Sequence, residues 1–104
     1  MERRVTIKMI PTGKEREFIE VEVYYDKGGR NIFSGRPEPR GFWISVSRIT
    51  KKGFFVKRQL FEGKRYFILE VKRYSDKSMN KAIDMAEEVY PKMVENVYGI
   101  DVEN

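Results

Sequence analysis

Aromatic and basic residues alternate along several stretches of this 104-residue chain, and together they could bind nucleic acid. Aromatic rings stack on unpaired bases, while lysine and arginine side chains neutralise phosphates. If a helix covers one face of a sheet, alternation assigns to the other face the aromatic residues Tyr24, Trp43, Phe55, Tyr66 and Tyr74, with Lys8, Lys57 and Lys72 between them. Glu20, Glu22 and Glu70 fall on the same face, so the rings could instead pair with one another or form a second small core.

Residues 26–41 form a long predicted loop that is rich in glycine, proline and arginine. Loops longer than a hairpin turn are often functional or disordered in compact domains. Glycines here could let the backbone approach phosphates, which would contact the cations Lys27, Arg30, Arg36 and Arg40. The same residues also fit a plain turn followed by a stiff, solvated segment. The loop contains no Walker-type or dinucleotide-binding pattern.

Positive charge is concentrated in the middle of the chain. The net charge is +5, but residues 40–73 carry ten Lys or Arg against two Glu, a net +8, whereas residues 76–104 carry three against seven acidic residues, a net −4. A basic field favours polyanionic partners, and an acidic helix face can simply be solvated. Cations at predicted turns would form two patches that serve solubility or bind duplex phosphates: Arg48, Lys51, Lys52, Lys64 and Arg65.

The composition excludes most hydrolase and zinc chemistries. The chain has no cysteine and no histidine, which removes thiolate nucleophiles and the commonest metal ligand and general base. Glu70-Val71-Lys72 resembles the second half of the metal-dependent restriction-type nuclease motif, in which acidic residues hold Mg²⁺ and the lysine helps to activate water. No Asp or Glu occurs between Glu38 and Glu62 to complete that motif, so we predict no catalytic residue, cofactor or metal.

Hydrophobic alternation predicts five strands in a single domain, residues 1–104. The strands are expected at about 4–10, 18–25, 42–49, 54–61 and 64–74, with a helix at about 76–98. This order predicts an α+β fold in which a five-stranded, mainly antiparallel sheet carries the long C-terminal helix on one face. The first two strands should form a hairpin, and short connections predict a meander for the last three. The residues expected to face the helix include Met9, Phe54, Val56 and Phe67.

The predicted helix carries an apolar stripe at spacings of three and four residues, from Met79 to Val97. The spacing continues through Pro91, so we expect one kinked helix that is capped by Ser75 or Ser78 and closed by Gly99. Most of the stripe should cover the sheet. Its C-terminal end could also contact a second copy in a homodimer, through Met93, Val94, Val97 and Tyr98.

Residues 25–46 contain two distinctive runs, Tyr25-Asp26-Lys27-Gly28-Gly29-Arg30-Asn31-Ile32-Phe33-Ser34-Gly35 and Arg40-Gly41-Phe42-Trp43-Ile44-Ser45-Val46. This stretch resembles small uncharacterised proteins of bacterial mobile elements, phages and plasmids, and the resemblance implies no known activity. At the level of architecture alone, a set of strands followed by one long helix is similar to Whirly-type single-strand DNA binders, which is an analogy of fold.

These observations lead to the hypothesis of a small non-enzymatic module that binds nucleic acid, in particular single-stranded DNA or RNA. The residues predicted to contact it are Trp43, Phe55, Tyr66, Tyr24, Arg30, Arg36, Arg40, Lys57 and Lys72. The alternative is a protein-interaction or inhibitor module of a mobile element, because Trp, Tyr and Arg also dominate protein hot spots. A metal-dependent nuclease is a distant third. No run is apolar enough for a membrane span or a signal peptide, so we expect a cytoplasmic protein with no membrane partner.

Overall fold

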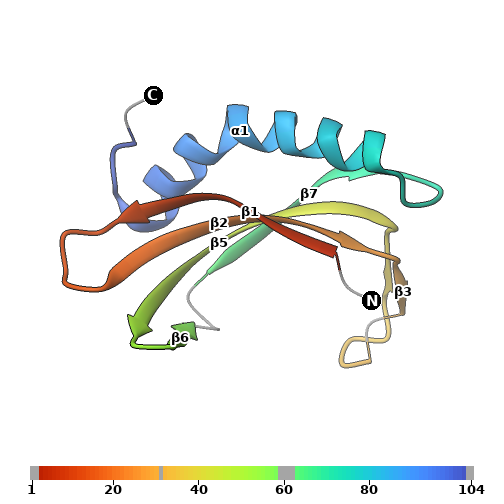
Figure 1. Cartoon of the computed structure of the whole chain (residues 1–104). Coiled ribbons are helices and arrows are strands. Elements are labelled where there is room, and N and C mark those ends of the chain that lie inside the picture. The colour runs from red at the N-terminus through yellow and green to blue at the C-terminus, as the bar shows by residue number, and fades with distance from the viewer. Residues whose placement is uncertain (1–2, 31, 59–62, 103–104) are drawn as a thin grey trace.

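One long helix packs across one face of a curved antiparallel sheet (Figure 1). The computed structural model describes residues 3–30, 32–58 and 63–102. The sheet contains β1 (Arg3–Pro11), β2 (Glu17–Asp26), β5 (Gly41–Lys52), β6 (Phe55–Arg58) and β7 (Lys64–Glu70), and the helix is α1 (Asp76–Tyr98). A separate two-stranded ribbon is formed by β3 (Gly29–Arg30) and β4 (Pro37–Glu38). The predicted α+β fold, a five-stranded sheet with a C-terminal helix on it, is confirmed.

β5 is the centre of the sheet. It pairs with β2 along nearly its whole length, from Gly41 opposite Asp26 to Thr50 opposite Glu17. Its other edge is shared, because β7 pairs with residues 41–46 and β6 pairs with residues 49–52. The expected meander is therefore wrong: β7 pairs with β5 and not with β6. The physical reason is length, since β6 has four residues and leaves most of the 12 residues of β5 for β7 to cover.

Several strand boundaries differ from the expectation, and β5, expected to end at residue 49, continues to Lys52. The strand expected at 64–74 ends at Glu70, and the next amide, of Val71, donates to the Arg40 carbonyl outside the ladder. Tyr74 was expected on the face away from the helix, but it packs against Tyr25 on the helix side, with ring centroids 5.3 Å apart. Of the strand expected at 54–61, residues 55–58 form β6, and residues 59–61 lie outside the described residues.

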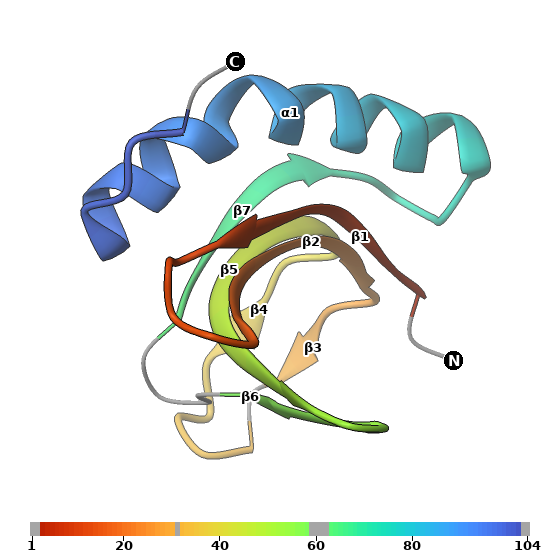
Figure 2. The same cartoon turned by 60° about the vertical axis from the view of Figure 1, so that its left-hand side comes forward.

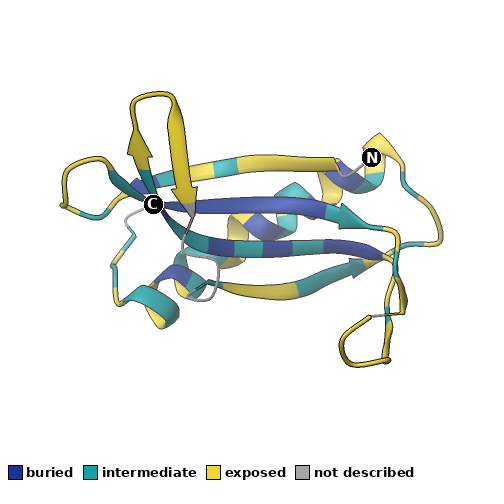
Figure 3. Cartoon of the chain, turned by 90° about the horizontal axis from the view of Figure 1, so that it is seen from below, coloured by how far each residue is buried: buried dark blue, intermediate teal, exposed yellow. Residues whose placement is uncertain are grey.

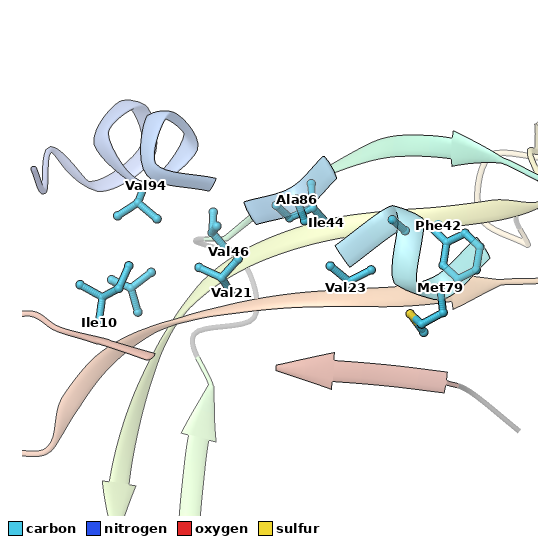
Figure 4. Close-up of a cluster of buried hydrophobic side chains, with 11 residues drawn as sticks. Ile10, Val21, Val23, Phe42, Ile44, Val46, Met79, Ala86 and Val94 are labelled. Atoms are coloured by element: carbon cyan, nitrogen blue, oxygen red, sulfur yellow. The ribbon is translucent and has the colours of Figure 1, made fainter. Parts of the chain in front are cut away.

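The core lies between α1 and the sheet (Figure 4). Alternate residues of β2 and β5 point toward the helix, namely Ile19, Val21, Val23, Phe42, Ile44 and Val46. The helix contributes Met79, Ala82, Ala86 and Val94 at the predicted spacing, and the two small alanines let its backbone approach the sheet closely. Val94, considered above for a homodimer contact, is fully buried in this core, and Met93, Val97 and Tyr98 pack against it.

α1 begins and ends where the sequence predicts. At its start, Ser75 Oγ accepts a hydrogen bond from the Ser78 amide at 3.1 Å, and Ser78 Oγ accepts one from the Ser75 amide at 3.2 Å. At its end, Gly99 adopts a φ of 68° and donates its N–H to the Glu95 carbonyl at 2.8 Å. The helix continues through Pro91 as one element. No helix in the described part of the chain is long and apolar enough to cross a membrane.

A bulge in β1, between Thr6 and Lys8, reverses the faces of the strand. One extra residue in a strand moves every following side chain to the opposite face. Ile10 therefore enters the core, and Met9, expected on that side, turns away from it. Lys8, expected among the aromatic residues on the other face, lies in register with the core residue Val21 and is exposed.

A second bulge, at Ile68 of β7, reverses two further predictions. On the N-terminal side of this bulge, Tyr66 is in register with Ile44 of the core, so Tyr66 lies on the helix side. Phe67 is in register with Trp43 and lies on the other side. The expected positions of Tyr66 and Phe67 are therefore both wrong, because the residues before the bulge have the opposite phase to those after it.

Gly41 occupies a position that no larger residue fits. Its φ is +158°, and a Cβ atom there would collide with the Leu69 carbonyl oxygen and the Phe67 ring. We expect Gly41→Ala to lower the free energy of unfolding by about 3 kcal/mol, measured by urea denaturation. Gly53→Ala is the matched control, because Gly53 also has a positive φ, +59°, but has open space around it. It should cost about 1 kcal/mol, and equal losses would contradict the steric explanation.

Candidate functional site

The sheet face away from α1, which we call the far face, is closed to solvent along β2. Only 3% of Glu22 and 6% of Tyr24 is exposed. Arg4 Nη1 donates to Glu22 Oε1 at 3.0 Å, and the Arg4 guanidinium lies 4.7 Å from the centroid of the Tyr24 ring. Thr6 Oγ1 donates to Glu20 Oε2 at 3.2 Å. Tyr24 was predicted to stack on a base, but its ring is already covered.

Arg65 joins the residues at the centre of the far face. Its guanidinium lies 4.4 Å from the centroid of the Trp43 ring, its Nη1 donates to the Tyr24 hydroxyl at 3.1 Å, and its Nη2 donates to Glu38 Oε1 at 3.2 Å. The hydrogen bond to Tyr24 and the charge of Glu38 outweigh partial burial and raise the pKa of Arg65 above its usual value. The Phe67 ring also contacts Trp43, with centroids 5.2 Å apart. Trp43, the main predicted stacking residue, therefore already has a cationic and an aromatic neighbour.

Arg40 holds the base of the long loop in place. Its Nε donates to the Lys27 carbonyl at 3.0 Å, and its Nη1 donates to the Lys72 carbonyl at 2.6 Å. Gly28, with a φ of +76°, lets the backbone of Glu38 approach within a distance that a Cβ atom would not allow. Arg40 was predicted to bind phosphate, but these two bonds already join the loop to the segment after β7. The Lys72 side chain is exposed at the same place.

The β3–β4 ribbon projects from one end of the sheet and is exposed over most of its surface (Figure 3). Arg30 Nη1 donates to the Gly35 carbonyl at 3.2 Å, and both Arg30 and Arg36 are exposed. Between them, 88% of Ile32 and 93% of Phe33 is exposed. Neither apolar residue was predicted to contact nucleic acid.

The β5–β6 hairpin lies on the side of the sheet opposite to α1 (Figure 2). At its turn Phe54 is fully exposed, and 79% of Phe55 is exposed. Phe54 and Val56 were expected to face the helix, which is wrong because the hairpin extends away from it. Exposed lysines flank the two rings, namely Lys51, Lys52 and Lys57.

The β1–β2 turn lies beside this hairpin. The Lys51 amide donates to the Arg16 carbonyl at 2.8 Å. A shallow hollow of about 540 Å³ lies between the two turns and is lined by Glu15, Arg16, Thr50, Lys51 and Lys52. We call the combined surface the basic end, and it consists of Lys14, Arg16, Lys51, Lys52 and Lys57 with Phe54 and Phe55, all of them exposed.

The predicted site residues lie in five separate places and do not form one surface. Tyr24 and Trp43 lie on the far face, and Phe55 and Lys57 lie at the basic end. Arg30 and Arg36 lie on the ribbon, and Arg40 and Lys72 lie at the base of the loop. Tyr66 lies on the helix side. Tyr66 borders a mostly apolar groove of about 430 Å³ between β7 and α1, which also involves Ile44, Ile68, Val89 and Met93. A platform that combines all nine residues is therefore not present.

Sequence reasoning missed Phe54 and Arg16 as members of an exposed basic surface. The available signal was the run Lys51-Lys52-Gly53-Phe54-Phe55, in which cations and rings meet at a turn. The contact with Arg16 is tertiary and left no local signal. Arg48, predicted to lie with Lys51 in one patch, instead has its guanidinium 5.3 Å from the centroid of the Tyr98 ring.

The residues of the nuclease-like motif do not lie on one strand. Glu70 is the last residue of β7, and Lys72 follows the end of that strand. In the ranges that the structure describes, no group of three or more His, Cys, Asp or Glu side chains is placed to hold a metal ion.

We expect Arg65→Gln to expose one face of the Trp43 ring, because the guanidinium that covers it is removed. Acrylamide quenching of the single tryptophan should then become stronger than in the unmodified protein. The free energy of unfolding should fall by about 1 kcal/mol, the usual scale of a partly exposed cation–π contact. Lys64→Gln is the matched control, since it removes a neighbouring exposed charge. If acrylamide quenches Trp43 equally in both variants, Arg65 does not shield the Trp43 ring.

Comparison with protein-family models, with curated proteins and with solved structures gave no match to this chain.

Proposed function

We propose that the protein is a small module that binds single-stranded DNA or RNA at its basic end. One observation carries the proposal: Phe54 and Phe55 are exposed at the turn of a hairpin whose strands also carry the exposed Lys51, Lys52 and Lys57. Burying a phenylalanine ring favours folding by about 1.5–3 kcal/mol, so the stability of the fold does not account for their position. A ligand that covers the rings would recover this free energy on binding.

The chemistry of the basic end complements both parts of an unpaired nucleotide. The rings of Phe54 and Phe55 can stack on bases, whose flat faces are open in a single strand. Phosphates can contact the cations around the hollow. Within that hollow Glu15 lies 3.9 Å from Arg16 and partly neutralises it, and the Lys51 ammonium lies 4.9 Å from the centroid of the Phe18 ring. Lys52 is therefore the strongest phosphate ligand of the three cations.

A duplex fits this surface less well than a single strand. The bases of a duplex are stacked on one another, so rings at the tip of a hairpin cannot reach their faces, and contact is limited to phosphates and groove edges. The alternative function, a protein-interaction module, would use the same exposed rings in a protein hot spot. It differs in predicting no salt-dependent affinity for an oligonucleotide.

We expect a labelled mixed-sequence single strand to bind the protein, with fluorescence anisotropy as the measurement. Affinity should rise by more than about tenfold when salt is lowered from about 200 to about 50 mM, because each phosphate contact releases counterions. Phe54→Ala should weaken binding by about fivefold or more, since stacking on one base contributes about 1–3 kcal/mol. Trp43 fluorescence should stay unchanged, because Arg65 and Phe67 already contact its ring.

Two controls separate this site from the rest of the surface. Val89→Ala removes an exposed apolar side chain from α1, and Lys81→Ala removes an exposed cation from the same helix. Both variants should bind the strand as the unmodified protein does. The proposal fails if the folded protein does not bind at about 50 mM salt, or if Phe54→Ala keeps full affinity. Quenching of Trp43 by a strand too short to extend beyond the basic end would mean that the ligand contacts the far face, and would overturn the assignment to the basic end.

A further inference from the structure

The β3–β4 ribbon repeats the chemistry of the basic end. Among the residues that the structure describes, the four most exposed large apolar side chains are Ile32 and Phe33 on the ribbon and Phe54 and Phe55 on the hairpin. Both pairs are adjacent in sequence and have exposed cations beside them, which on the ribbon are Arg30 and Arg36. The ribbon and the β5–β6 hairpin, which we call the two arms, therefore present the same combination of apolar surface and positive charge.

The two arms stand at opposite ends of β5 and on the same side of the sheet. β5 begins at Gly41, shortly after β4, and it ends at Lys52, where the hairpin turns. Both arms project away from α1 (Figures 1 and 2). Twelve residues of strand span roughly 36 Å along their path at about 3.3 Å per residue, and the curvature of the sheet shortens the direct distance.

Between the arms, the far face offers little to a nucleic acid. Glu20 and Glu22 are buried there, and the cations of this face, Arg4 and Arg65, already pair with Glu22 and Glu38. Tyr24 and Trp43 are covered by arginine side chains. A ligand that approaches this side of the sheet therefore meets the two arms first.

We propose that one single strand of nucleic acid bridges both arms, with Phe33 and Arg36 as a second contact region. This inference rests on the proposed function. Charge favours a polyanion in this place, because both arms are cationic whereas the helix on the opposite side carries five acidic residues against three lysines. At the stacked spacing of about 3.4 Å per nucleotide, roughly ten nucleotides cover the length of β5. A shorter strand reaches only one arm.

The ribbon is held in place before any ligand arrives. Arg65 donates from β7 to Glu38 of β4 at 3.2 Å, and Arg40 donates to the Lys27 carbonyl at the base of the loop at 3.0 Å. An arm that is already positioned loses less conformational entropy on binding. Once a strand has bound at the basic end, its contact with the ribbon is intramolecular, so a long strand gains affinity that a short one does not.

The test compares thymidine strands of about 5 and about 16 nucleotides by fluorescence anisotropy. A variant with both Phe33→Ala and Arg36→Ala should bind the long strand at least about fivefold more weakly. The negative slope of the logarithm of its association constant against the logarithm of the salt concentration should become shallower by about 0.7, because one phosphate contact is lost. Its affinity for the short strand should not change, because the five cations of the basic end select that site. Phe54→Ala should weaken the binding of both the short and the long oligonucleotide. The control carries Val89→Ala and Lys81→Ala, which remove an apolar and a cationic side chain from α1.

The outcomes separate this inference from the proposed function. If the ribbon variant binds the long strand like the unmodified protein while Phe54→Ala loses affinity, the basic end acts alone; the bridging inference fails and the proposed function stands. If neither strand binds, the proposed function itself fails and the inference with it. Binding to phosphatidylserine vesicles that requires Phe33 and Phe54, without binding to either strand, would assign the arms to a membrane surface and overturn both.

Discussion

The pairing of β2 with β5 is the constraint on which the rest of the structure depends. The two strands pair along nearly their whole length, and β2 is buried from Ile19 to Tyr24 on both of its faces. Antiparallel sheets commonly leave one face in water, where polar residues need no protein partner. Burial on both faces requires every side chain of this part of β2 to be either apolar or paired. On one face β-branched residues meet the alanines and methionine of α1. On the other face carboxylates are buried, and a buried carboxylate requires hydrogen bonds and a compensating charge such as Arg4 provides.

Burial of both faces leaves the ends of the strands as the places where the chain meets its surroundings. The two arms are attached directly to this central pair, because the ribbon joins the end of β2 to the start of β5 and the hairpin continues β5 itself. Exposed loops on a rigid scaffold are the usual location of binding residues in small domains. Here the most firmly paired part of the sheet sets the separation of the arms, while Arg40 and Arg65 set the position of the ribbon.

Local signals in the sequence were sufficient for the helix, the first hairpin and the fold class. The cap at Ser75, the stripe through Pro91 and the alternation in β2 each act within a few residues. The bulges could not be predicted, because Ile68 looks like any other apolar strand residue and a shift of one residue exchanges the two faces. Trp43 was assigned to the correct face. Its neighbours Arg65 and Phe67 lie on β7, far along the sequence, so no local pattern predicted that they would shield its ring. Phe54 was assigned to the helix side by alternation along its strand, and alternation does not reveal that the hairpin is directed away from the helix.

The outer edges of the sheet are poor templates for adding a strand from another molecule. Long, uninterrupted edges promote aggregation, because their free backbone groups pair with any extended chain. One edge is divided between β6 and β7 and bulged at Ile68, and the other, β1, is bulged after Thr6 and lined by exposed Arg3, Arg4 and Lys8. Phe55 lies on β6, which is itself an edge strand, but only four residues of β6 pair with β5, and the hairpin carries the exposed Lys51, Lys52 and Lys57. An extended chain from another molecule would therefore meet only a short, positively charged ladder beside the exposed rings, and both features oppose edge-to-edge aggregation.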